Sequence, residues 1–324
     1  MNKIISKSCA NGLKIIYQKD NRDELIALNI FLPLGIQNER DCKGIGAFIT
    51  NMLFKGTKVF DINSFAYELE INGVKINSSR RDDYIHFSIL MHKDSFTKGM
   101  ELFFEMFFNP RFENNEIEKL KQEYIHKLKS RHDNISTICF DDFLNIVYGG
   151  SHPYSWLTIG TEKSISSINR ERLLDFHKDF MLSVPPIITI LGEVDEIVLE
   201  EVLINRFKDL EYRKNNEYSL DEIKLPENEA KIKRIKKSFN QAYIMSGFII
   251  PNFQSPYFLL VKIINSFLGE GMTSLFFDRI REKMGIVYEI GSFYSINKSQ
   301  NYWAIHLGLD KNNVQKALDT IDKE

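Results

Sequence analysis

The chain has 324 residues, of which 43% are hydrophobic and 27% are charged, with 42 Lys and Arg against 44 Asp and Glu. This composition excludes a disordered tail and a membrane bundle, and the nearly balanced charge excludes a global basic field for nucleic acid or anionic lipid. The length favours two domains. Three widely spaced cysteines, an N-terminus unlike a secretory signal and the lack of a long apolar run predict a cytoplasmic protein.

The first half alternates between strand and helix patterns. Strands are predicted from β-branched and aromatic runs, and helices from apolar residues at a spacing of three and four. In chain order these are strands at 13–17 and 25–34, helices at 44–54 and 61–70, a strand at 84–91, helices at 96–108, 114–131 and 169–180, and a buried strand at 185–192.

The second half repeats this order with a strand at 242–251, a helix at 258–268, a strand at 302–309 and a helix at 311–321. A stretch rich in Lys, Glu and Asn separates the halves. We therefore predict an α+β fold of two homologous domains, each an antiparallel sheet covered by helices. The predicted limits are 1–215 for the first domain, 216–237 for the linker and 238–324 for an incomplete second domain.

The helix at 44–54 is apolar except for a stripe formed by Ala47, Thr50 and Asn51, which share one face. Its frame of Gly44, Phe48 and residues 52–57 resembles the signature helix of the pitrilysin/insulinase-type zinc metallopeptidases, which include the processing peptidases and carry an inverted H-x-x-E-H motif. Other blocks extend the resemblance over nearly the whole chain, among them His152-Pro153-Tyr154, Leu191-Gly192-Glu193 and 281–288. The resemblance implies a processing-peptidase-like fold.

The residues that carry chemistry in that family are replaced here. Ala47 and Asn51 stand at the two histidine positions and Thr50 at the position of the general base. The third ligand of the family, a glutamate roughly 76 residues later on a charged helix, falls on Lys127. A catalytic zinc site needs three protein ligands and an open position for water, which a methyl and an ammonium group do not supply. We expect no zinc and no other cofactor, and the seven scattered histidines offer no obvious replacement site.

The resemblance also implies that an arginine and a tyrosine of the second domain reach the substrate, and these match Arg281 and Tyr288. A guanidinium and a phenol both donate hydrogen bonds to a developing oxyanion. The simpler alternatives are a surface ion pair of Arg281 with Asp278 or Glu282, and a packing role for Tyr288 in a strand.

The leading hypothesis is a pseudoenzyme that forms a heterodimer with a zinc-bearing homologous subunit, helps to enclose a peptide or unfolded polypeptide, and supplies Arg281 and Tyr288. No nucleic acid or membrane partner is expected. The alternative is a structural or peptide-binding scaffold with no proteolytic role. A shortened gene product is a third reading, because the second domain stops inside a helix. An active zinc metalloendopeptidase has the least support from the residues.

Overall fold

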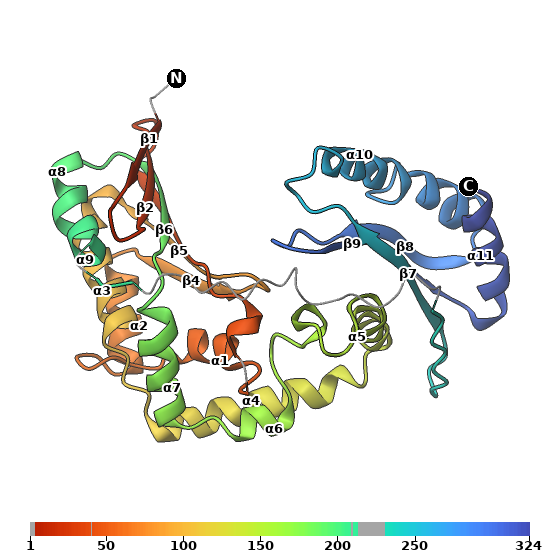
Figure 1. The fold of residues 1–324 in the computed structure, drawn as a ribbon, viewed down its shortest axis with the longest axis horizontal. Coiled ribbons are helices and arrows are strands. Elements are labelled where there is room, and N and C mark those ends of the chain that lie inside the picture. Colours follow the sequence, from red (N-terminus) through yellow and green to blue (C-terminus); the bar gives the residue numbers. More distant parts are fainter. Residues whose placement is uncertain (1–3, 40, 209, 213–230) are drawn as a thin grey trace. The chain divides into compact units, whose positions relative to one another are not determined.

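The computed structural model of the chain describes residues 4–39, 41–208, 210–212 and 231–324 (Figure 1). Contacts between Cα atoms group the chain into two compact units. Among the described residues, unit 1 comprises 4–126 and 157–212, and unit 2 comprises 127–156 and 231–324.

Unit 1 is built on a six-stranded sheet with the order β1-β2-β6-β3-β5-β4. The β2–β6 pair is parallel and the other neighbouring strands are antiparallel. The strands are β1 (Ile4–Ser8), β2 (Lys14–Lys19), β3 (Leu25–Leu32), β4 (Lys75–Arg80), β5 (Ile85–His92) and β6 (Ile187–Gly192).

The core of unit 1 follows from the period-two pattern of the central strands. In β3, alternate residues from Ile26 to Leu32 are at most 1% exposed, because they face the covered side of the sheet. The helical stripe predicted at 96–108 packs on this side, where the ring of Phe87 lies 5.7 Å from both Phe103 and Phe107.

The helices of unit 1 lie mostly where the apolar spacing predicts them. The side chain of Asp61 caps one of them by accepting from the backbone N–H groups of Asn63 and Ser64. The helices are α1 (Ile45–Met52), α2 (Ile62–Ile71), α3 (Phe96–Phe108), α4 (Asn114–Arg131), α6 (Glu162–Ser166), α7 (Arg170–Phe176), α8 (Glu196–Leu199) and α9 (Asn205–Lys208), with α4 continuing into unit 2.

Unit 2 contains a three-stranded antiparallel sheet with the order β7-β9-β8. Its elements are α5 (Ile135–Tyr148), β7 (Ala242–Ile250), α10 (Phe258–Leu268), β8 (Val287–Tyr294), β9 (Asn301–Leu309) and α11 (Val314–Lys323), with a helical segment at 277–283. The order strand, helix, helical segment, two strands, helix repeats that of β3, α1, α2, β4, β5 and α3. The pairing β7-β9-β8 repeats β3-β5-β4. The α+β architecture with helix-covered, mainly antiparallel sheets is therefore present in both units.

The grouping of residues 127–156 differs from the limits drawn from the sequence, which placed them in the first domain. These residues group with unit 2 because α5 packs on its sheet, where Phe143 lies 5.3 Å from Tyr302. The same region holds His152, which is fully buried and stacks on Tyr148. The His152-Pro153-Tyr154 motif thus serves the packing of unit 2.

Of the linker predicted at 216–237, residues 216–230 lie outside the described part of the chain, and residues 231–237 are exposed without regular secondary structure. None of the helices in the described ranges has the length and apolar character needed to cross a membrane.

Candidate functional site

Helix α1 begins at a close approach between two loops. Gly44 has φ of +89°, and a Cβ atom on it would lie 2.7 Å from the backbone of Gly160, so only glycine fits. The Gly44 N–H donates to the carboxylate of Glu39 at 2.6 Å, and Arg80 of β4 holds the same carboxylate at 3.0 Å. Both side chains are almost fully buried, and burial raises the pKa of Glu39. This network ties the start of α1 to the edge of the sheet.

The polar side chains of the stripe predicted on α1 donate hydrogen bonds to one backbone carbonyl oxygen. The carbonyl oxygen of Ala47 accepts from the hydroxyl of Thr50 at 2.9 Å and from the side-chain amide of Asn51 at 2.8 Å. It also accepts from the hydroxyl of Tyr124, on α4, at 2.8 Å. The amide of Asn51 donates in turn to the Tyr124 oxygen at 2.8 Å. The polar hydrogens of this stripe are thus bonded to neighbours within unit 1.

Tyr124 joins this cluster from the buried face of α4. It is 3% exposed, and its ring lies 5.2 Å from that of Phe48. Burial raises the pKa of Tyr124 to about 12, so the phenol keeps its proton at neutral pH and donates it in a hydrogen bond. Thr50 and Ala47 are buried, whereas Asn51 is exposed.

The donor set at this place does not fit the family's zinc. Zinc in proteins is bound by thiolate, imidazole or carboxylate groups, and the cluster offers a methyl group, two hydroxyls and an amide. Lys127 lies one turn after Tyr124 on α4, and its side chain is exposed. Within the described residues, no group of three or more His, Cys, Asp or Glu side chains is arranged to hold a metal ion.

Arg281 and Tyr288 both lie on unit 2 and are exposed. The Arg281 guanidinium lies over the ring of Phe277, 4.7 Å from its centroid. Asp278 pairs with Lys283 at 2.6 Å, and in the described part of the chain no carboxylate lies within 4.0 Å of Arg281. The surface ion pair of Arg281 with Asp278 or Glu282, which was the simpler alternative, is therefore not formed among the residues that the structure describes. Tyr288, on β8, is 61% exposed.

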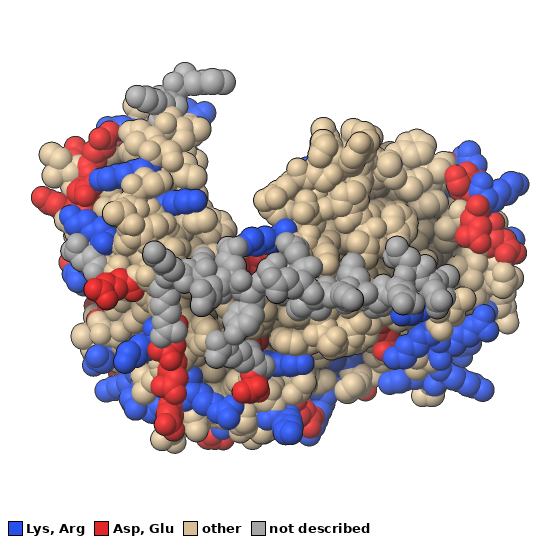
Figure 2. All heavy atoms as spheres, in the orientation of Figure 1, with Lys and Arg blue, Asp and Glu red and all other residues tan. Residues whose placement is uncertain are grey.

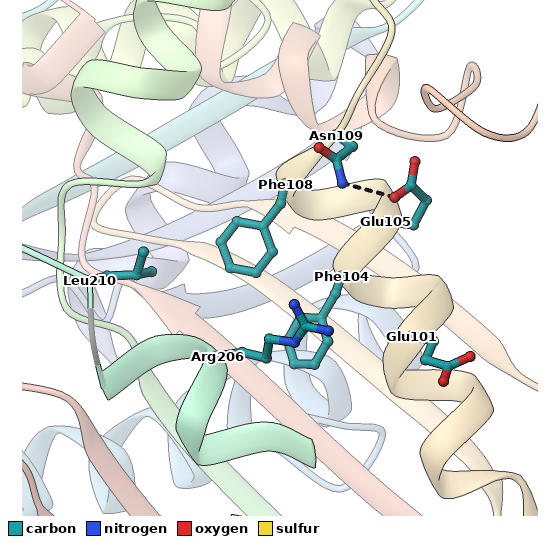
Figure 3. A pocket seen from close by; sticks show the side chains of 7 residues that line it. All are labelled: Glu101, Phe104, Glu105, Phe108, Asn109, Arg206 and Leu210. Carbon is teal, nitrogen blue, oxygen red and sulfur yellow. Dashed lines mark hydrogen bonds between the residues drawn. The ribbon is translucent and has the colours of Figure 1, made fainter. Parts of the chain in front are cut away.

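A separate pocket of about 340 Å³ lies between α3 and α9 in unit 1 (Figure 3). Its floor is aromatic, and Arg206 lies over the Phe104 ring at 5.7 Å. The Asn109 amide donates to Glu105 at 2.8 Å, so part of its polar lining is already paired. None of the residues predicted for the site lines it. The lining consists of Glu101, Phe104, Glu105, Phe108, Asn109, Arg206 and Leu210.

Sequence reasoning missed Tyr124, Glu39 and Arg80. The signal for Tyr124 is its position three residues before Lys127, on the apolar stripe of α4 that includes Leu120 and Leu128. Glu39 and Arg80 carry no local pattern that pairs them, because 41 residues separate them in the chain.

The repeated α+β units and the sequence of helix α1 are typical of one class of protein, the homologues of zinc metallopeptidases. In this chain the H-x-x-E-H motif of that class is absent from α1. Residues 14–152 match the family described as insulinase (peptidase family M16), and residues 167–324 match its domain described as peptidase M16 inactive domain. The chain belongs to peptidase family M16.

Relatives and solved structures extend this match. An uncharacterized zinc protease of Bacillus subtilis, YmxG, is 24% identical over 319 residues, which cover 98% of this chain and 76% of that protein. One from Rickettsia bellii is 25% identical over 288 residues, covering 88% and 68% respectively. A protease structure from Helicobacter pylori has a TM-score of 0.87 at 19% identity, covering all of this chain and 80% of the other. The structure of a peptidase M16 inactive domain from Pseudomonas fluorescens has a TM-score of 0.85 at 18% sequence identity. The match covers 99% of this chain and 79% of the other.

Proposed function

We propose that the chain is a non-catalytic member of the family that acts with a zinc-bearing homologous subunit on peptides or unfolded polypeptides. The observation that carries this proposal is the cluster on α1. Ala47, Thr50 and Asn51 stand where the family has its ligands and base, and their hydrogen bonds run to one another and to Tyr124. Such a site lacks a group to hold zinc or to take a proton from water.

The edge of the unit 1 sheet supports a role in holding a peptide. β4 is the last strand in the sheet order and packs beside α1, where the Ser78 hydroxyl donates to the Thr50 carbonyl at 3.4 Å. An edge strand presents backbone N–H and C=O groups with which an extended peptide can pair. We therefore infer that a bound peptide runs along β4, past the cluster on α1.

Arg281 and Tyr288 are the groups proposed to act on the substrate held by the partner subunit. Both are exposed, and the guanidinium is bound to no carboxylate among the described residues. In this proposal they donate hydrogen bonds to the carbonyl oxygen as it gains charge, while the zinc subunit supplies the metal. The three unpaired cysteines are consistent with the cytoplasmic location that we propose for this assembly.

The test uses the purified full chain, alone and mixed with a homologous subunit that carries an intact H-x-x-E-H. Alone, it should contain no stoichiometric zinc by elemental analysis and cleave no fluorogenic peptide. In the mixture, Arg281→Ala should lower kcat by about tenfold or more, whereas the neighbouring exposed variant Lys283→Ala should leave it unchanged. Zinc bound at one ion per isolated chain, or full activity of the Arg281→Ala mixture, would refute the proposal.

A peptide-binding scaffold without a proteolytic role is the second candidate. It is favoured by the contact of Arg281 with Phe277, which gives the guanidinium a structural partner. If the chain binds peptides but never raises the turnover of a zinc-bearing subunit, this candidate replaces the first.

A further inference from the structure

The pocket between α3 and α9 in unit 1 has walls that the fold holds in place. The hydroxyl of Tyr212 donates to the backbone carbonyl oxygen of Phe207 at 3.0 Å. The side-chain amide of Asn11 donates to three carbonyl oxygens, those of Phe207 at 3.0 Å, Lys208 at 2.8 Å and Leu210 at 3.1 Å. These bonds fix the end of α9, so the pocket of about 340 Å³ is largely preformed. Its volume lies near the lower end of the range for small-molecule sites, about 300 to 1,000 Å³.

The floor of the pocket is aromatic. Phe104 is 6% exposed, and its ring lies 5.8 Å from that of Phe108 and 5.7 Å from that of Phe207. Phe108 lies 5.8 Å from Phe207, so the three rings support one another. Leu210 adds a further apolar group to the lining. An aromatic or branched apolar group of a ligand gains most from such a floor, because it leaves water and packs on the rings.

Arg206 gives the pocket a cation with unused hydrogen-bond donors. Its guanidinium lies over the Phe104 ring, 5.7 Å from the centroid. In the described ranges no carboxylate oxygen lies within 4.0 Å of Arg206, although Glu101 and Glu105 line the same pocket. A guanidinium presents its N–H groups in a planar fork that matches the two oxygens of a carboxylate. A carboxylate is therefore the group that we expect at Arg206.

The acidic part of the lining offers one carboxylate with spare capacity. Glu105 already accepts from the backbone N–H of Val59 at 3.3 Å and from the side-chain amide of Asn109 at 2.8 Å. Glu101, one turn earlier on α3, pairs with the Lys98 ammonium at 3.9 Å. Both members of this pair are exposed, and such a contact is weak. An ammonium group of a ligand can therefore bind beside Glu101.

These groups follow one another along the pocket. Figure 3 shows Phe108 and Leu210 on one side of Arg206, and Glu101 on the other. Figure 2 shows acidic and basic side chains intermixed around α8 and α9, so this surface attracts neither anions nor cations over a long range. A ligand that carries one charge of each sign and no net charge is consistent with such a surface.

We propose that this pocket binds a free α-amino acid with an aromatic or branched apolar side chain. The α-carboxylate binds the Arg206 guanidinium, the α-ammonium binds Glu101, and the side chain packs on Phe104 and Phe108. The site lies within unit 1 and requires neither a metal nor a partner subunit, so it stands independently of the proposed function.

Isothermal titration calorimetry of the full chain with L-phenylalanine tests the proposal. We expect a Kd of about 1 mM or below. N-acetyl-L-phenylalanine lacks the ammonium group and L-phenylalaninamide lacks the carboxylate, so each should bind at least about tenfold more weakly. These two compounds also represent the carboxyl end and the amino end of a peptide. The proposal is wrong if L-phenylalanine does not bind, or if either analogue binds as tightly.

Two substitutions place the binding in this pocket. Arg206→Gln and Glu101→Gln should each weaken the binding of L-phenylalanine at least about tenfold, because each removes one charged partner. Lys208→Gln is the matched control and should bind like the wild type, since Lys208 is an exposed cation of α9 that does not line the pocket. Circular dichroism of each variant checks that its helix content is unchanged. Binding that survives both pocket substitutions would overturn the assignment to this site.

Discussion

The phenol oxygen of Tyr124 lies 2.8 Å from the side-chain nitrogen of Asn51 and 2.8 Å from the carbonyl oxygen of Ala47. A buried tyrosine on α4 therefore forms hydrogen bonds with the face of α1 that carries Ala47 and Asn51. The contact holds α4 against α1 through hydrogen bonds with the Ala47 carbonyl and the Asn51 amide.

The variant Tyr124→Phe should lower the free energy of unfolding by about 1 to 2 kcal/mol, since the Ala47 carbonyl and the Asn51 amide lose a partner. Urea denaturation followed by far-UV circular dichroism measures the change. Tyr67→Phe on the exposed face of α2 is the control and should stay within about 0.5 kcal/mol of the wild type. Equal effects of the two variants would show that the Tyr124 hydroxyl has no role in holding α1.

The double variant Ala47→His/Asn51→His should acquire zinc affinity, because two imidazoles four residues apart on a helix can bind one ion. We expect binding at least tenfold tighter than that of the single variant Asn51→His in isothermal titration calorimetry. The double variant should still not hydrolyse peptides, as Thr50 cannot act as the general base. No gain over the single variant would mean that the two positions do not converge on one point.

Gly160→Ala should destabilise the protein far more than Gly73→Ala, although both glycines have positive φ. A Cβ atom at Gly160 would lie 2.2 Å from the carbonyl oxygen of Lys43, whereas one at Gly73 has no neighbour within 4 Å. We expect a loss of more than about 3 kcal/mol at Gly160 and about 1 kcal/mol at Gly73. Thermal unfolding of the two variants in parallel checks this, and similar melting temperatures would contradict it.

The stability of the protein should carry a pH dependence from Asp82. Burial, with the neighbouring Asp83 carboxylate, raises the pKa of Asp82 to about 6 from its ordinary value of 3.8. The folded state therefore binds the proton more tightly than the unfolded state. The stability that the protonated Asp82 carboxyl adds to the folded state is present below about pH 4 and is lost as the pH rises to about 6.

Relative to the wild type, Asp82→Asn should thus become more stable between pH 4 and pH 7 by up to about 3 kcal/mol. Chemical denaturation at several pH values measures this difference. Asp175→Asn, at an exposed position of α7, is the control substitution. A pH-independent difference for Asp82→Asn would rule out the buried carboxyl as its source.

The sequence predicted most elements because their signals are local. The alternation in β3 and the apolar spacing of α3 depend on residues only two to four positions apart, and the structure places both as expected. The frame of α1 was likewise recognisable, and the family it indicated is the one to which the chain belongs.

Contacts between segments that are distant in the chain could not be predicted from local sequence patterns. The contact of Tyr124 with α1 depends on how α4 is placed on the unit, which spacing along α4 does not encode. The grouping of α5 with unit 2 depends on its packing against Tyr302, more than 150 residues away. Apolar spacing along the chain identifies which face of a helix is buried. It does not identify the surface against which that face packs.

The carboxylate of Glu39 has a broader consequence. It anchors the first turn of α1 to Arg80 through groups that take no part in metal binding. The placement of the helix therefore depends on atoms other than the side chains of Ala47, Thr50 and Asn51. A chain built in this way can exchange the side chains of that stripe and retain its fold, which leaves the architecture open to recruitment for other tasks.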